Sequence, residues 1–214
     1  QDGLRRDCDK HGILLESRKR KDGSGMRLQD FVEMAHAAEV ELDFSETAAL
    51  RLYTTAAYRT INGDMRDQER FKDGREHRLP ITVYLIKKAL GKLRGVNADK
   101  GSGNDSVEFY RGMRDLRVSD DFAVKGGTEL APMSATSSLK VAMMYSVSER
   151  SLLLRIKTTS FINRAPGISW LSAFPAEEEY LFPPLTYLEP IGSPQLKRID
   201  DATYTIIEVM PTFS

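Results

Sequence analysis

The chain has 214 residues, of which 41% are hydrophobic and 29% are charged, ordinary values for a globular protein with a buried core. Lysine plus arginine number 31, and so do aspartate plus glutamate, so the formal net charge is zero. A balanced charge lacks the basic excess that drives sequence-independent binding to nucleic acids, and it gives no reason to expect a membrane surface as a partner.

The cysteine content and the chain start bear on the compartment. The single cysteine, Cys8, cannot form an intramolecular disulfide, which is compatible with a reducing compartment and does not exclude export. No apolar run approaches the ~20 residues of a membrane-spanning helix, and no signal peptide is visible. Because the chain begins at Gln1, we interpret it as a processed product or an excised segment, either cytoplasmic or delivered outside the cell.

Residues 1–27 are polar and charge-dense, and residues 18–21 are four consecutive basic residues. Two interpretations are open: a solvated tail, or a basic contact surface for a partner. The composition favours the tail.

Residues 28–100 predict a helical lobe. Ser45 can cap a helix whose first turn contains Glu46, and Asn62-Gly63 would end that helix. Its apolar stripe is Ala49, Leu52, Tyr53, Ala56 and Thr60. A second helix follows Pro80, and Gly91 and Gly95 weaken its end. Its apolar face is Ile81, Tyr84, Leu85, Ala89 and Leu93.

A glycine- and serine-rich loop at 101–105 separates this lobe from short extended runs bounded by turn residues. The runs cover 107–111, 152–157, 179–188 and 203–209, and a helix at 139–147 interrupts them. Helices followed by strands predict an α+β fold rather than alternating βαβ units. We therefore expect one domain over 28–214, with a helical lobe at 28–100 and a β-rich core at 105–214.

Several common cofactor sites are not encoded. The sequence contains no dinucleotide-binding glycine motif after a strand, no phosphate-binding P-loop, no C-x-x-C pair and no H-E-x-x-H. His11, His36 and His77 are scattered among polar residues, which suits surface positions better than metal ligands. We predict no metal site.

Two glutamates in the strand-rich half have a spacing that suits chemistry at a sugar carbon. If a strand includes 177–179, Glu177 and Glu179 point to the same face, about 7 Å apart. One carboxylate can then stabilise developing positive charge while the other takes a proton, as in glycosidases. A glutamate-rich stretch is, however, more often solvated surface.

Two other segments offer complementary groups. Arg111 can bind phosphate oxygens, and Gly112 after it lets a ligand approach the backbone. Ser134 falls where a strand ends, which leaves its hydroxyl available to a carboxylate, whereas Ser137 suits a helix cap.

Together these segments resemble the R-S-E class of mono-ADP-ribosyltransferases. That family has an arginine, then a Ser-x-Ser/Thr segment, then Glu-x-Glu, and this chain has Arg111, Ser134-Ala135-Thr136 and Glu177 to Glu179 in the same order. Residues 53–66, YTTAAYRTINGDMR, are similar to the family's helical signature, with Met65 in place of leucine.

The resemblance implies that NAD is the substrate, bound in a cleft between two packed β-sheets. Arg111 would hold its phosphate side, and the Gly112 backbone would contact the nicotinamide amide. Tyr145 would pack on nicotinamide, although core packing is an equal alternative, and Arg150 would be a second phosphate contact. Tyr53 and Asn62 of the helical signature would also contribute to NAD binding.

The same resemblance assigns the catalytic roles. Glu179 would bind the ribose 2′-hydroxyl and stabilise the oxocarbenium ion formed as nicotinamide leaves, and Ser134 would orient it. Glu177 would prepare the acceptor, and Phe174 lies where the family has an aromatic residue that meets the acceptor. A carboxylate at 177 implies a protein arginine as acceptor, because guanidinium is protonated at neutral pH and must lose a proton to attack.

Three alternatives remain open at this point. An NAD glycohydrolase, with water as acceptor, needs Arg111, Ser134 and Glu179 equally. The second alternative is a catalytically silent NAD-binding or interaction module. The presence of both Glu177 and Glu179 argues against it, because a silent module needs neither. A nucleic-acid binder based on the basic run is disfavoured by the zero net charge.

Overall fold

The computed structural model describes residues 6–9, 11–100, 106–199 and 202–213. The chain divides into a helical unit, Gln1–Val96 with Gly167–Glu177, and a sheet unit, Asn97–Pro166 with Glu178–Ser214. This division differs from the expected one, in which 1–27 is a separate tail and 167–177 belongs to the β-rich core. The loop expected at 101–105 lies outside the described residues.

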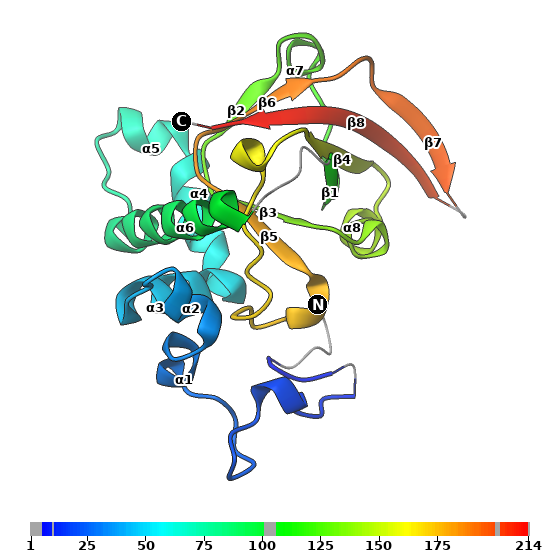
Figure 1. The fold of residues 1–214 in the computed structure, drawn as a ribbon. Helices are drawn as coiled ribbons and strands as arrows, with labels where there is room; N and C mark the ends of the chain where they lie inside the picture. The colour runs from blue at the N-terminus through cyan, green and yellow to red at the C-terminus, as the bar shows by residue number, and fades with distance from the viewer. Residues whose placement is uncertain (1–5, 10, 101–105, 200–201, 214) are drawn as a thin grey trace. The chain divides into compact units, whose positions relative to one another are not determined.

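The helical unit is built from short helices and one longer helix. They are η1 (Glu16–Arg18), α1 (Leu28–Val32), α2 (Ala35–Glu39), α3 (Phe44–Leu52), the π-helical turn η2 (Tyr53–Ala57), α4 (Tyr58–Arg66), α5 (Gln68–Lys72), α6 (Pro80–Lys100) and η4 (Pro175–Glu177) (Figure 1). Helix α3 begins with a capping box, in which Asp43 accepts from the Glu46 amide at 2.8 Å and Glu46 accepts from the Asp43 amide at 2.9 Å. The cap is therefore Asp43 and not Ser45, which already lies inside the helix.

The long helix expected after residue 43 is broken in its middle. Thr55 has non-helical backbone angles (φ −99°, ψ −179°), and its hydroxyl donates back to the Leu52 carbonyl at 2.7 Å. Such back-bonding competes with the helical ladder, and π-helical turns often mark functional sites. Beyond the break, Ala56 is exposed and leaves the apolar stripe. Helix α4 then continues past Asn62, because Gly63 does not adopt the positive φ of a helix end.

Helix α6 buries only part of the face expected for it, since Ala89 and Leu93 are buried as expected. Its buried side chains are Ile86, Ala89, Leu90 and Leu93. Ile81 and Tyr84 in the first turns are 73% and 63% exposed. Gly91 and Gly95 have no neighbouring atoms where a side chain would stand, so they lie on the open side of the helix and do not end it.

The sheet unit confirms the α+β class. Its elements are β1 (Val107–Met113), α7 (Asp120–Lys125), β2 (Gly127–Glu129), β3 (Met133–Thr136), α8 (Leu139–Ser146), β4 (Ser151–Thr158), η3 (Phe161–Asn163), β5 (Glu179–Phe182), β6 (Thr186–Pro190), β7 (Gln195–Ile199) and β8 (Ala202–Thr212) (Figure 1). The four expected strand regions and the helix near 139–147 are present. The sequence missed α7, β2 and β7, whereas the strand expected at Ser134 is present as β3. The run at 179–188 is two strands separated by a turn.

The strands form one continuous sheet where two packed sheets were expected. Their order is β2-β6-β8-β4-β1-β3-β5, with β7 also paired to β8. The long strand β8 joins the sheet because it pairs in parallel with β4 and antiparallel with β6 and β7. The central strand β4 is buried along most of its length, as expected for a strand covered on both faces. The hydrophobic core of this unit consists of Phe109, Met133, Ala135, Leu152, Leu154, Ile156, Ala165, Phe182, Leu188, Ile207 and Val209.

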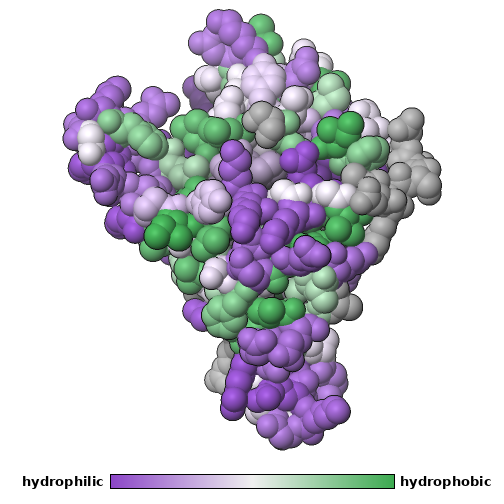
Figure 2. All heavy atoms as spheres, turned by 60° about the vertical axis from the view of Figure 1, so that its left-hand side comes forward, coloured by the Kyte–Doolittle hydropathy of each residue, from purple (hydrophilic) through white to green (hydrophobic). Residues whose placement is uncertain are grey.

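The surface drawn in Figure 2 mixes hydrophilic side chains with separate hydrophobic patches. Among the residues that the structure describes, no helix combines the length and the apolar character needed to cross a bilayer.

Candidate active site

The pairing of β3 with β5 brings a serine beside a glutamate. Thr136 is the register partner of Glu179, and Ser134 lies two residues along the same strand and therefore on the same face. The Ser134 hydroxyl donates to Oε1 of Glu179 at 2.8 Å. Glu179 is only 7% exposed, so its carboxylate is held in one orientation close to the protein interior.

The side chain of Arg111, on β1, contacts the same serine. Strands β1 and β3 pair antiparallel over a short length, with Tyr110 opposite Thr136. The Arg111 guanidinium Nη1 donates to the Ser134 carbonyl at 2.5 Å. Arg111, Ser134 and Glu179, which lie far apart in the sequence, are thus linked through the main chain and side chain of one serine.

An ion-pair ladder fixes the strand that carries Arg111. Arg155 on β4 binds Glu108 on β1 at 2.7 and 2.9 Å and Glu208 on β8 at 2.8 Å. Burial alone would raise the pKa of Glu108, but hydrogen bonds from Arg155 and Tyr110 outweigh burial and lower it. Burial and the neighbouring Glu108 raise the pKa of Tyr110, which therefore stays protonated at neutral pH.

Glu177 does not lie on the strand, and the expected shared face with Glu179 is wrong. Pro175 begins the short helix η4, and the Glu177 amide donates to the Phe174 carbonyl at 3.0 Å. Glu178 then adopts a positive φ of 48°, a conformation that is costly for a residue with a side chain. The strand can therefore start only at Glu179.

Glu178, between Glu177 and Glu179, has a hydrogen-bond partner that the sequence did not indicate. Ser137, expected to cap a helix, donates through its hydroxyl to Oε2 of Glu178. The cap of α8 is Ser138, whose hydroxyl accepts from the Val141 amide at 3.4 Å. The only sequence signal for this pair is the second serine three positions after Ser134.

Helix α8 occupies the side-chain face of Gly112. A Cβ atom at this position would lie 1.9 Å from the Ala142 carbonyl oxygen of α8. Tyr145 on the same helix is half-buried, and its carbonyl accepts from Arg114 Nε at 3.0 Å. Arg150 is exposed in the turn before β4.

The remaining candidates belong to the helical unit. The Asn62 amide donates to the Tyr53 hydroxyl at 3.1 Å, and both side chains are buried, so this pair ties α4 to the π-helical turn before it. Phe174 and Glu177, the two expected acceptor residues, lie in one turn that is closed by the hydrogen bond between them.

The chemistry of this donor set suits a dinucleotide with a cleavable sugar bond. A guanidinium complements phosphate, and a fixed carboxylate complements positive charge that develops on a ribose. Within the described part of the chain, no group of three or more His, Cys, Asp or Glu side chains could hold a metal ion.

Comparisons with known proteins agree with this donor set. The model of the family described as "NAD:arginine ADP-ribosyltransferase" matches residues 13–202, and the chain therefore belongs to this family. None of the curated protein sequences matches the chain.

Several solved structures share the fold. Plx2a, an ADP-ribosyltransferase toxin from Paenibacillus larvae, has a TM-score of 0.61 at 18% identity, covering 87% of this chain and 95% of its own. HopU1 of Pseudomonas syringae pv. Tomato DC3000 has a TM-score of 0.60 at 19% identity, covering 85% of each chain. Vis of Vibrio splendidus has a TM-score of 0.59 at 21% identity, covering 85% of this chain and 82% of its own, and has also been solved in complex with agmatine.

The chain is therefore an NAD-dependent mono-ADP-ribosyltransferase with NAD as its substrate. The resemblance to the arginine-specific class, first seen in the order of three short motifs, is confirmed at the level of the family.

Proposed function

We propose that the acceptor is an arginine on a protein surface and that Glu179, Ser134, Arg111 and Glu177 carry the reaction. The bond between nicotinamide and the ribose C1′ breaks, nicotinamide leaves with the bonding electron pair, and an arginine nitrogen bonds to C1′ and loses a proton. The observation that carries the proposal is the hydrogen bond from Ser134 to the buried Glu179 carboxylate, together with the Arg111 contact to the same serine.

The roles follow from charge and position. Glu179 stabilises the positive charge that develops on the ribose, and Ser134 keeps its carboxylate oriented. Arg111 binds the phosphates of NAD. Tyr145 and Arg150 of the sheet unit and Tyr53 and Asn62 of the helical signature are further proposed NAD contacts.

The acceptor is handled by the turn that contains Phe174 and Glu177. This turn directly precedes Glu179 along the chain, and Glu177 is half-exposed. A carboxylate there can bind a guanidinium and accept its proton as attack develops. Agmatine, with which Vis has been solved, carries the same guanidinium group as arginine and supports this choice of acceptor.

Two substitutions test the proposal, with nicotinamide release and agmatine modification measured separately. Glu179→Gln should lower both by about 10²–10³-fold, because a stabilising charge is lost. Glu177→Gln should lower agmatine modification by a similar factor of about 10²-fold or more while nicotinamide release to water stays nearly unchanged. Near-normal turnover in folded Glu179→Gln would refute its role.

The second variant also separates the two enzymatic alternatives. If the parent chain releases nicotinamide but modifies neither agmatine nor poly-arginine, and Glu177→Gln changes nothing, the activity is that of a glycohydrolase. A loss of NAD affinity in Glu177→Gln would place this residue on NAD and contradict its assignment to the acceptor.

A further inference from the structure

The segment Gly167–Glu177, called here the acceptor loop, is held by side chains from the N-terminal part of the chain. Apart from the short helix η4 it has little regular structure, so its backbone carbonyls need partners from elsewhere. Arg18 donates to three of them: the Ser169 carbonyl at 2.8 Å, the Ser172 carbonyl at 3.3 Å and the Trp170 carbonyl.

Arg51 and the Asp7 backbone amide bind two further carbonyls of the acceptor loop. Arg51 Nη1 donates to the Leu171 carbonyl at 2.6 Å, and the Asp7 amide donates to the Ala173 carbonyl at 2.9 Å. Five successive carbonyls, from residue 169 to residue 173, are therefore bound. The loop also donates to the helices, since the Ala173 amide bonds to the Thr54 hydroxyl at 2.9 Å.

The two arginines, one buried and one partly buried, share a counter-ion. The Arg18 side chain is 3% exposed and the Arg51 side chain is 17% exposed. Asp7 forms an ion pair with each of them, at 3.3 Å from Arg18 Nε. Both guanidiniums lie over the Phe31 ring, at 5.2 and 4.6 Å from its centre.

A solvent-exposed tail would not contain a buried arginine paired in this way. Arginine is almost never fully buried unless its charge is paired, and burial lowers the pKa of Arg18 while Asp7 counteracts that effect. The planar guanidinium presents several donors in a fixed geometry, which suits a side chain that must bind several carbonyls at once. The expectation of a solvated tail at 1–27 therefore does not hold for Asp7 and Arg18, which bind the loop.

We propose that Arg18 and Arg51, bridged by Asp7, are positioning residues that hold the acceptor loop in the conformation needed for transfer to arginine. This inference rests on the proposed function, in which Phe174 and Glu177 at the end of the loop handle the acceptor. The clamp acts on the backbone just before these two residues, so loosening it displaces them without altering any residue proposed to bind NAD.

The test compares Arg18→Met and Arg51→Met with the parent chain in two activities, agmatine modification and nicotinamide release to water. A displacement of about 1 Å at a reacting group can cost on the order of 10²-fold in rate. We therefore expect kcat/KM for agmatine to fall by about 10- to 100-fold, with nicotinamide release within about twofold of the parent.

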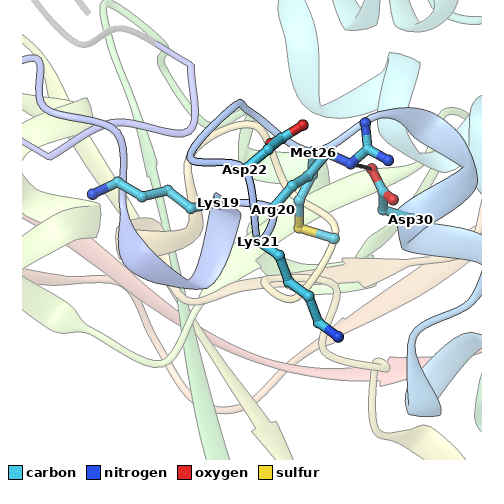
Figure 3. Close-up of a pocket in the computed structure, with 6 residues that line it drawn as sticks. All are labelled: Lys19, Arg20, Lys21, Asp22, Met26 and Asp30. Atoms are coloured by element: carbon cyan, nitrogen blue, oxygen red, sulfur yellow. Dashed lines mark ion pairs between the residues drawn. The ribbon is translucent and has the colours of Figure 1, made fainter.

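A matched control lies two residues along the chain. Arg20 belongs to the same basic run, but its guanidinium pairs with Asp30 at 3.4 Å (Figure 3). It lines a surface hollow with Lys19, Lys21 and Met26, and Figure 3 draws the ion pair to Asp30 as its contact there. Arg20→Met removes the same charge and volume and should leave both activities unchanged.

Hydrogen exchange provides a readout that global destabilisation does not imitate. Loss of the clamp should increase amide exchange over residues 170–177 while the buried turns of α6 stay protected. If Arg18→Met does not fold, Arg51→Met and Asp7→Asn carry the same comparison, because these side chains are less deeply buried.

The possible outcomes separate the clamp from the proposed function. Selective loss of agmatine modification with faster loop exchange supports the clamp, and equal loss of both activities without a local change in exchange overturns it. If the parent modifies neither agmatine nor poly-arginine, the proposed acceptor chemistry fails by itself. The exchange data then decide the clamp, and unchanged exchange over 170–177 in the variants overturns it.

Discussion

Replacing Ser134 by alanine removes one hydrogen bond at the centre of the candidate site. The Ser134 hydroxyl donates to Oε1 of Glu179 at 2.8 Å, and the acceptor is a carboxylate that is only 7% exposed. A hydrogen bond to a charged group is worth about 1.5–3 kcal/mol, and about 1.4 kcal/mol corresponds to a tenfold change in rate. We therefore expect Ser134→Ala to lose about 10- to 150-fold in kcat/KM for NAD.

The loss should be the same in nicotinamide release and in agmatine modification, because both reactions need an oriented Glu179. The measurement is steady-state release of nicotinamide with and without agmatine, together with thermal unfolding to confirm that the variant is folded. The main-chain contact from Arg111 to the Ser134 carbonyl remains in this variant, so NAD binding should change little.

Ser137→Ala is the matched control, since Ser137 lies on the same segment and also donates to a carboxylate, that of Glu178. Ser137 and Glu178 are both exposed, so the loss of their hydrogen bond should not slow nicotinamide release. Rates for Ser134→Ala within about twofold of the parent would refute the orienting role, and so would an equal loss in Ser137→Ala.

Two further predictions concern stability. Gly112→Ala should destabilise the sheet unit by about 1–3 kcal/mol or more, because the new Cβ would lie 1.9 Å from the Ala142 carbonyl. Gly91 lies in open space on α6, so Gly91→Ala should instead stabilise the protein slightly. Denaturant titrations measure the free energy of unfolding of both variants, and a Gly112→Ala protein more stable than Gly91→Ala would contradict the packing argument. Hydrogen bonds from Arg78 hold the pKa of Asp64 well below its usual range, so this carboxylate stabilises the fold fully above the pKa of an unfolded aspartate and loses that effect as pH falls through its folded value. The stability deficit of Asp64→Asn in urea should therefore be larger at about pH 7 than at about pH 3, and a deficit independent of pH would be inconsistent with this pairing.

Local patterns in the sequence were sufficient for the class of fold and for the order of the reactive residues. The apolar extended runs at 107–111 and 152–157 are β1 and β4 in the structure, and the helix expected near 139–147 is α8. These features depend on side-chain periodicity and on nearby turn residues, which act over a few positions. The order of Arg111, Ser134 and the glutamates along the chain could be predicted from the sequence motifs alone.

Tertiary contacts decided what lies beyond a few residues. Glu177 is kept off the strand by Pro175 and by the positive φ of Glu178, and the alternation rule could not foresee that conformation. The single sheet exists because β8 pairs with three other strands, of which β4 is distant in the sequence. Composition indicated that Arg18 is a solvated residue, yet it is buried.

The burial of Arg18 has a physical reason that no local pattern contains. Its guanidinium is stable inside the protein because Asp7 supplies a counter-charge and because carbonyls about 150 positions away along the chain accept its hydrogen bonds. The sequence alone therefore determined which residue types are available for NAD chemistry and in what order. Only the folded chain decided which of them meet, since Ser134 and Glu179 become neighbours through the register of β3 and β5, and the acceptor loop acquires its anchors through the partners that its carbonyls find.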